Sequence, residues 1–127
     1  MCGIIGSTKH IIDRVILNDI NHRGPDSKGL YSDEHISLGH ARLSIIDLVS
    51  GQQPMVSNDG QKILVFNGEI YNYRELKKDL DCEFSTSSDT EILLKYYEKH
   101  GLKKTLKEAN GMFAFCIYDS IKNELFC

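Results

Sequence analysis

A run of four apolar residues, Ile63-Leu64-Val65-Phe66, constrains the fold of this chain more than any other feature. Successive side chains of a strand point to opposite faces, so a strand made only of apolar residues needs cover on both sides. The run therefore predicts a central strand of a sheet that lies between two packed layers. Apolar or alternating segments predict further strands at residues 3–7, 29–31, 35–44, 112–118 and 124–127.

Helices are expected between these strands. Residues 11–20 carry apolar side chains at helical spacing, and residues 73–80 predict a short helix. Ser88-Asp89-Thr90-Glu91 matches a capping box, which starts a helix whose apolar side chains are Ile92, Leu93, Tyr96 and Tyr97. A further short helix is expected at 103–109, and loops at 22–26 and 52–60. This order of elements favours an α+β fold with antiparallel sheets covered by helices over repeating βαβ units.

Size and composition narrow the function. The 127 residues suit one domain, and 41% hydrophobic with 26% charged residues is typical of a folded chain. The net charge is −3 and no Lys/Arg run makes a phosphate-binding stripe, so nucleic acid and anionic membranes are poor partners. No apolar stretch is long enough to span a bilayer, and no signal peptide is recognisable. These features predict a cytoplasmic protein with reduced thiols.

The cysteines and histidines lack the spacing of a metal site. The four cysteines form no CxxC pair, and the five histidines form no HxxxH or CxxH pair. Neither a structural zinc site nor a disulfide framework is expected. Cys116 lies in an apolar segment and is predicted to be a small core residue.

A cysteine directly follows the initiator Met1. If Met1 is removed, Cys2 becomes the amino terminus and supplies both a thiol nucleophile and a free α-amine. Such an amine has a pKa of about 7.7–8.0, against about 8.5 for a thiol, so it can accept or relay the thiol proton. No other cysteine of the chain can use a main-chain amine in this way. A chance cysteine at the start of a buried strand is the alternative.

Six blocks of the sequence favour a nucleophilic role for Cys2 over a chance cysteine. They are Met1-Cys2-Gly3-Ile4-Ile5-Gly6, His22-Arg23-Gly24-Pro25-Asp26, Arg42-Leu43-Ser44-Ile45-Ile46-Asp47, Phe66-Asn67-Gly68-Glu69-Ile70-Tyr71-Asn72, Ser88-Asp89-Thr90-Glu91 and Gly111-Met112-Phe113-Ala114-Phe115. In this order they resemble the glutaminase domain of class II glutamine amidotransferases. Within that class the chain is most similar to glutamine-hydrolysing asparagine synthetases.

The resemblance implies a fold and a partner. The fold is the N-terminal-nucleophile hydrolase sandwich, in which antiparallel sheets lie between helical layers. Residues 1–127 would be a glutaminase domain that is incomplete at its C-terminus, because the family domain continues with further strands. In the family an ATP- and magnesium-using synthetase domain follows, and it receives the ammonia. A homodimer is also considered. No cofactor is expected in the glutaminase domain itself, which has no Gly-rich phosphate loop.

The resemblance also implies roles for particular residues. Cys2 would be the nucleophile, and the Asn67 side chain and Gly68 N–H would bind the oxyanion. The glutamine substrate would be bound by Arg42, Leu43, Ile45, Glu69 and Asp89. Arg42 suits the α-carboxylate and Asp89, assisted by Glu69, suits the α-ammonium.

Structural explanations remain open for these residues. Asn67-Gly68 is a common hairpin-turn pair, and Arg42 ends a predicted strand where a charge is usually solvated. Asp89 at a helix start complements the helix dipole. Residues 23–26 are expected to form a shaped loop near the site, with no catalytic step.

The sequence leaves three functions open. The first is glutamine hydrolysis that feeds asparagine synthesis from aspartate. The second is the glutaminase part of a related amidotransferase with another acceptor, such as a cell-surface sugar precursor. The third is a catalytically silent fragment or an interaction domain with the same fold. The chain with Met1 retained is expected to be a poor enzyme, because the α-amine of Cys2 is then in a peptide bond.

Overall fold

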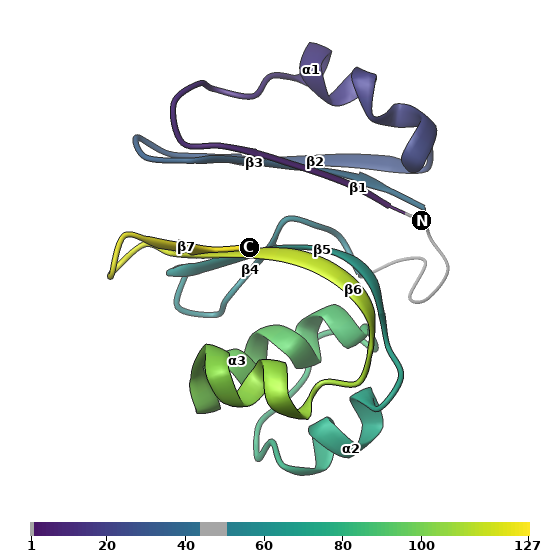
Figure 1. Ribbon diagram of the computed structural model, residues 1–127, viewed down its shortest axis with the longest axis vertical. Helices are drawn as coiled ribbons and strands as arrows, with labels where there is room; N and C mark the ends of the chain where they lie inside the picture. Colours follow the sequence, from purple (N-terminus) through teal and green to yellow (C-terminus); the bar gives the residue numbers. More distant parts are fainter. Residues whose placement is uncertain (1, 44–50) are drawn as a thin grey trace.

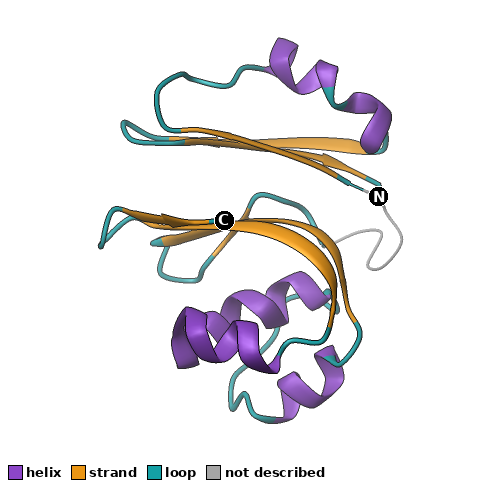
Figure 2. Cartoon of the chain, viewed as in Figure 1, coloured by secondary structure: helices purple, strands orange, loops and turns teal. Residues whose placement is uncertain are grey.

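The chain folds as a sandwich of two antiparallel sheets between helical layers, as the computed structural model of residues 2–43 and 51–127 shows (Figures 1 and 2). The first sheet has the order β1-β3-β2 and the second the order β4-β5-β6-β7. Helix α1 covers the outer face of the first sheet, and helices α2 and α3 cover the outer face of the second (Figure 1). The expected α+β class and layered architecture are confirmed.

The elements of each sheet are grouped along the chain. The first sheet and its helices comprise β1 (Gly3–Ser7), α1 (Arg14–Asp19), the 3-10 helix η1 (Asn21–Arg23), β2 (Ser27–Ser32) and β3 (Ser37–Arg42). The second sheet and its helices comprise β4 (Met55–Val56), β5 (Lys62–Ile70), α2 (Tyr73–Lys78), α3 (Asp89–Glu108), β6 (Gly111–Asp119) and β7 (Glu124–Phe126). None of the helices in these described ranges has the length and apolar character needed to cross a membrane.

Strand β5 is the centre of the second sheet, as its apolar run predicts. Its side chains alternate between two cores. Leu64 and Phe66 pack with helices α2 and α3, whereas Ile63 and Val65 pack between the sheets with residues such as Leu38. All four side chains of the run are at most 2% exposed. Burial of each such side chain contributes about 1.5–3 kcal/mol, so β5 holds both cores together.

Helix α3 follows its predicted apolar pattern. Ile92, Leu93, Tyr96 and Tyr97 are all buried against the second sheet and α2. The separate helical segment expected at 103–109 is confirmed in substance, because the range Asp89–Glu108 joins two helical segments and the second ends at Glu108. At Gly101 the backbone has φ 75° and ψ 171°, so the two helical segments join across a kink.

Three other details differ from expectation. In the 11–20 segment the helix covers only 14–19, and its buried residue is Leu17, whereas Val15 is 70% exposed. Ile12 is buried in the irregular segment before the helix begins, so the helix expected over 11–20 is too long. The loop at 52–60 contains the short strand β4.

Cys116 is half-buried beside the inter-sheet core, and not enclosed in it. Its sulfur lies 2.7 Å from that of Cys127 on the next strand, and both are free thiols. Burial, followed by the neighbouring thiol, raises the pKa of Cys116 to about 12. This thiol is therefore protonated and unreactive at neutral pH.

Candidate functional site

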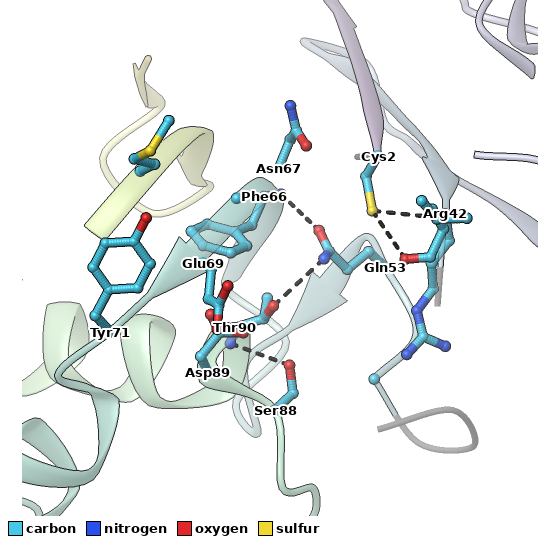
Figure 3. A pocket seen from close by; sticks show the side chains of 14 residues that line it. Cys2, Arg42, Gln53, Phe66, Asn67, Glu69, Tyr71, Ser88, Asp89 and Thr90 are labelled. Atoms are coloured by element: carbon cyan, nitrogen blue, oxygen red, sulfur yellow. Dashed lines mark hydrogen bonds between the residues drawn. The ribbon is translucent and has the colours of Figure 1, made fainter. Parts of the chain in front are cut away.

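A cavity of about 230 Å³ is lined by residues of both sheets and of the start of helix α3. A single water needs about 10–15 Å³ by a comparable measure, so the cavity has room for a molecule the size of an amino acid. In Figure 3, Cys2 and Arg42 lie on one side, and Asn67, Glu69 and Asp89 lie on the other. The first sheet therefore supplies one wall and the second sheet with α3 the opposite wall.

Cys2 precedes strand β1 and lies beside the end of β3. The pairing of Gly3 with Ala41 in the antiparallel register places Cys2 next to residues 42 and 43. The Cys2 sulfur accepts a hydrogen bond from the Leu43 nitrogen at 3.4 Å and donates to the Leu43 oxygen at 3.6 Å. These contacts hold the half-buried thiol at the cavity wall, in reach of a ligand.

Arg42 is the last residue of β3 and is only 5% exposed. The predicted solvated strand end is therefore wrong, and Arg42 is part of the wall of the cavity. The loop at residues 23–26 packs against this strand end, where the Asp26 nitrogen donates to the Arg42 oxygen at 3.0 Å. A Cβ on Gly24 would lie 2.3 Å from the Ala41 oxygen, so only glycine permits this approach. A loop at this place is confirmed for residues 24–26, whereas residues 22 and 23 of the expected loop belong to the 3-10 helix η1.

Asn67 and Gly68 are interior residues of β5, and the hairpin turn that this pair suggested is wrong. They pair with Ala114 and Phe113 of β6. Gly68 has φ 150°, and a Cβ there would lie 2.2 Å from the Met112 oxygen. The positive φ belongs to an irregularity within a continuous strand, and it requires glycine. Within the described residues the buried Asn67 Oδ1 has no hydrogen-bond partner, which is unusual for a side chain that serves packing alone.

Asp89 begins helix α3 and is 6% exposed. Its Oδ2 accepts a hydrogen bond from the Ile70 nitrogen at 2.9 Å, at the end of β5. Burial raises the pKa of the Asp89 carboxyl above its usual value; hydrogen bonds from the Ile70 and Thr90 nitrogens oppose the rise, and the charge of Glu69 adds to it. Two carboxylates that repel each other in one wall favour a bound cation between them.

The loop before α3 is held by the carboxylate of Glu91, which lies in the first turn of the helix. The Ser88 hydroxyl accepts from the Thr90 nitrogen at 3.1 Å, as an N-cap residue does. Glu91 does not close the predicted capping box onto Ser88. Its carboxylate instead accepts from the nitrogens of Ser85 and Thr86, at 2.9 and 2.6 Å. This buried residue therefore fixes the loop that leads into Asp89.

Every residue predicted for the site lies in the wall of this one cavity, except Ile45. The wall contains Cys2, Arg42, Leu43, Asn67, Gly68, Glu69 and Asp89. Ile45 lies outside the described residues, as do the neighbouring positions 44 and 46–50. Residues 2–43 and 51–127 contain no cluster of three His, Cys, Asp or Glu side chains that would suit a metal ion.

Sequence reasoning missed other residues of the wall, among them Gln53, Tyr71 and Thr90. Gln53 stands in a segment predicted as a loop, and nothing in its surroundings indicates burial. Its side chain is nevertheless 8% exposed. The only signal in the sequence was the position of Gln53 shortly after the Arg42 block. In the fold Gln53 lies beside β5.

The arrangement can act on a zwitterionic substrate. One wall offers a thiol and a guanidinium, and the other offers an amide, a glycine in a strand and two carboxylates. An amino acid has a carboxylate and an ammonium that match the guanidinium and the carboxylates. A thiol opposite amide donors is suited to acyl transfer.

Comparison with known proteins agrees with this chemistry. A family model described as a glutamine amidotransferase domain matches residues 1–127. The putative asparagine synthetase [glutamine-hydrolyzing] 2 of Methanocaldococcus jannaschii is 43% identical over 100% of this chain and 29% of that protein. Asparagine synthetase [glutamine-hydrolyzing] 1 of Bacillus subtilis is 40% identical over 99% of this chain and 22% of that protein.

A solved structure shares the fold. The glutamine phosphoribosylpyrophosphate amidotransferase from B. subtilis matches with a TM-score of 0.55 and 28% identity, over 68% of this chain and 21% of that chain. The chain thus spans less than a third of the length of each of these relatives. The match of the family model over the whole length, together with the layered antiparallel fold, shows that the chain belongs to the glutamine amidotransferase domain family.

Proposed function

We propose that this chain hydrolyses glutamine to glutamate and ammonia through a thioester on Cys2. The observation that carries the proposal is the shared cavity, which gathers Cys2, Arg42, Asn67, Gly68 and Asp89 from two sheets and a helix. These residues are far apart in sequence and include every group that acyl transfer from an amino-acid amide requires. The family match adds to this, because the names of the relatives specify glutamine hydrolysis.

The substrate is held by its amino-acid end. The Arg42 guanidinium pairs with the α-carboxylate, while Asp89 and Glu69 face the α-ammonium. Leu43 and Ile45 contact the rest of the molecule beside Cys2. This places the side-chain amide of glutamine between the Cys2 thiol and the Asn67–Gly68 segment of β5. Positioning of this kind replaces a bimolecular encounter by a local step.

The reaction proceeds in two acyl transfers. After removal of Met1, the α-amine of Cys2 takes the thiol proton, and the sulfur attacks the amide carbon of glutamine. The Asn67 side chain and the Gly68 N–H donate to the oxyanion that forms. The carbon–nitrogen bond breaks, ammonia leaves with the proton from the amine, and a thioester remains. Water then attacks the thioester, which releases glutamate and restores the thiol. No cofactor takes part in these steps.

The ammonia has a further use in this proposal. A synthetase domain, which is not among these residues, would use ATP and magnesium to activate aspartate and would combine it with ammonia to give asparagine. The asparagine synthetases among the relatives support this acceptor. The relative named for phosphoribosylpyrophosphate keeps the second candidate in view, which is the same hydrolysis coupled to another acceptor. A thiol nucleophile fits the reducing cytoplasm, where we place the reaction.

Release of ammonia and glutamate from L-glutamine tests the proposal, in the protein that carries this chain. Intact mass first reports whether Met1 has been removed. Cys2→Ala should abolish hydrolysis, whereas Cys82→Ala, which alters an exposed thiol outside the cavity, should leave it unchanged. Synthesis from added ammonium should survive Cys2→Ala. Hydrolysis that persists in Cys2→Ala, or is absent from the unaltered protein without Met1, overturns the proposal and favours a silent domain.

A further inference from the structure

The peptide of Phe66, directly before Asn67, is held by two buried side chains. The Gln53 Oε1 accepts a hydrogen bond from the Phe66 nitrogen at 2.6 Å. The His40 Nε2 donates to the Phe66 oxygen at 3.1 Å. Gln53 is 8% exposed and His40 is fully buried. Both backbone groups of one residue therefore have side-chain partners from outside their sheet.

These side-chain contacts replace the backbone pairing that β5 loses where β4 ends. Strand β4 pairs with β5 only at Ile63 and Leu64. Phe66 follows Leu64 by two residues, so its backbone groups point to the same edge of β5. The residue before β4 is Pro54, which has no N–H to donate. A buried edge without partners is unfavourable, and the side-chain oxygen of Gln53 and ring N–H of His40 satisfy it.

The same two side chains join the parts of the cavity wall. His40 is in β3, two residues before Arg42, and pairs with Ile4 of β1. The Gln53 amide nitrogen donates to the Thr90 hydroxyl at 3.5 Å, next to Asp89. Phe66 is thereby linked to the sheet that carries Cys2 and, through Gln53, to the start of α3. Figure 3 shows Gln53 between β5 and Thr90.

His40 is in the state that this role needs. Burial lowers the pKa of its imidazole to about 4, and the charge of Arg42 adds to the effect, against the hydrogen bond to Phe66. The ring is therefore neutral at pH 7. Within the described residues its Nδ1 has no hydrogen-bond partner. A neutral ring protonated at Nε2 leaves Nδ1 as a bare acceptor and keeps the donor on Phe66.

We propose that His40 and Gln53 are positioning residues for glutamine hydrolysis, which hold the Phe66 peptide so that Asn67 and Gly68 face the Cys2 thiol. The inference rests on the proposed function. Neither side chain needs to touch glutamine, because each acts through the backbone of β5. Asn67 and Gly68 follow Phe66 directly, so a rotation of that peptide redirects both oxyanion donors together. Loss of either contact should slow the chemical step more than it weakens substrate binding.

Paired substitutions separate positioning from general stability. His40→Leu and Gln53→Leu remove the donor and the acceptor, whereas His40→Gln and Gln53→Glu keep them. The Leu variants should lower kcat about tenfold to 100-fold, the effect expected from a misplacement of about 1 Å, with KM for glutamine changed by less than about twofold. The conservative variants should recover most of the loss. His35→Leu and Gln52→Leu alter exposed neighbours and should behave as the unaltered protein.

Two further measurements do not depend on turnover. Alkylation of Cys2 by iodoacetamide depends on the exposure and ionisation of the thiol and not on the oxyanion donors, so its rate should be the same in all folded variants. Nitrogen NMR of the unaltered protein should show His40 neutral and protonated at Nε2 at pH 7. This measurement decides the case if the Leu variants fail to fold, because a charged ring or an Nδ1–H tautomer rules out the contact with Phe66.

The outcomes distinguish this inference from the function on which it rests. If the unaltered protein without Met1 releases no ammonia from glutamine, the proposed function fails and the positioning role fails with it. If it hydrolyses glutamine and folded His40→Leu and Gln53→Leu match its kcat, the positioning role alone is overturned. A rise in KM at constant kcat also overturns it, because that would indicate ground-state binding.

Discussion

The Asp89 carboxylate accepts a hydrogen bond from the Ile70 backbone nitrogen at 2.9 Å, which ties the start of α3 to the end of β5. Asp89 therefore has one oxygen engaged in the fold and lies in the cavity wall as well. The dipole explanation and the substrate-binding explanation considered for this residue are compatible. This contact fixes the position of the Asp89 carboxylate in the cavity wall.

Asp89→Asn is the first test of this arrangement. The amide oxygen can still accept from Ile70, so the fold should persist, but the charge that faces the substrate ammonium is gone. Loss of one charged contact costs about 1.5–3 kcal/mol, so KM for glutamine should rise about tenfold to 100-fold. Steady-state kinetics measures the change, and circular dichroism controls for folding. An unchanged KM would remove Asp89 from the substrate site.

Arg42→Lys tests the other end of the substrate. Lysine keeps the charge but cannot form the two-pronged contact of a guanidinium with a carboxylate. We expect KM for glutamine to rise about tenfold, with a smaller change in kcat. Arg23→Lys, at the end of the 3-10 helix η1, is a matched exchange outside the cavity wall and should have little effect. Equal effects at both positions would argue against a specific role for Arg42.

Asn67→Ala removes one of the two proposed oxyanion donors. Removal of one such donor typically lowers kcat about 10²–10³-fold, or about 2.7–4 kcal/mol. KM should change little, because the donor acts mainly on the charge that develops during reaction. The comparison of kcat with KM decides the role: a pure KM effect places the Asn67 amide on the ground-state substrate.

Gly68→Ala tests the backbone of β5. The added Cβ would meet the Met112 oxygen at 2.2 Å, at a φ that side chains rarely adopt. We expect β5 and β6 to separate locally, with a stability loss of about 1–3 kcal/mol and no measurable hydrolysis. Thermal melting and ammonia release measure the two effects. Gly60→Ala also has positive φ but open space around it, so it should retain activity.

His40 gives a pH dependence with a defined sign. Its pKa falls from 6.5 to about 4 in the folded protein, so between these values the unfolded chain binds a proton that the folded chain does not. Stability should therefore decrease as the pH falls from 6.5 to 4, by about 3 kcal/mol from this group. The free energy of unfolding, compared with that of His40→Gln, isolates the effect. A parallel pH profile in the two proteins would contradict it.

Local patterns predicted most of the elements, because their signals lie within a few residues. The apolar run at 63–66 indicated the strand between two cores, and Ser88 indicated the start of α3. The pattern at 11–20 failed because Ile12 is buried in the irregular segment before the helix and Leu17 is the buried residue of the helix itself. Helical spacing cannot distinguish those cases without the sheet against which the segment packs.

The site was predictable only in part, for a related reason. Cys2, Arg42 and Asn67 carry chemistry that their residue types and family resemblance indicate. Gln53 and His40 act through a backbone peptide that is brought to them by the packing of two sheets. No local pattern encodes such a contact. The Asn67-Gly68 pair shows the same limit, since its hairpin signal is overridden by the long pairing of β5 with β6.

The division of the cavity wall between two sheets has a consequence for the role of the core. Cys2 and Arg42 belong to one sheet, and Asn67 and Gly68 to the other, so neither sheet holds a working centre. A small shift of one sheet across the other would part the thiol from the oxyanion donors while both hydrogen-bond ladders stay intact. The inter-sheet core that contains Leu38 and Val65 therefore fixes the geometry of the proposed site as much as the residues of the cavity wall do. A substitution in the interior of the sandwich can therefore reduce the proposed ammonia release without altering any residue of the cavity wall.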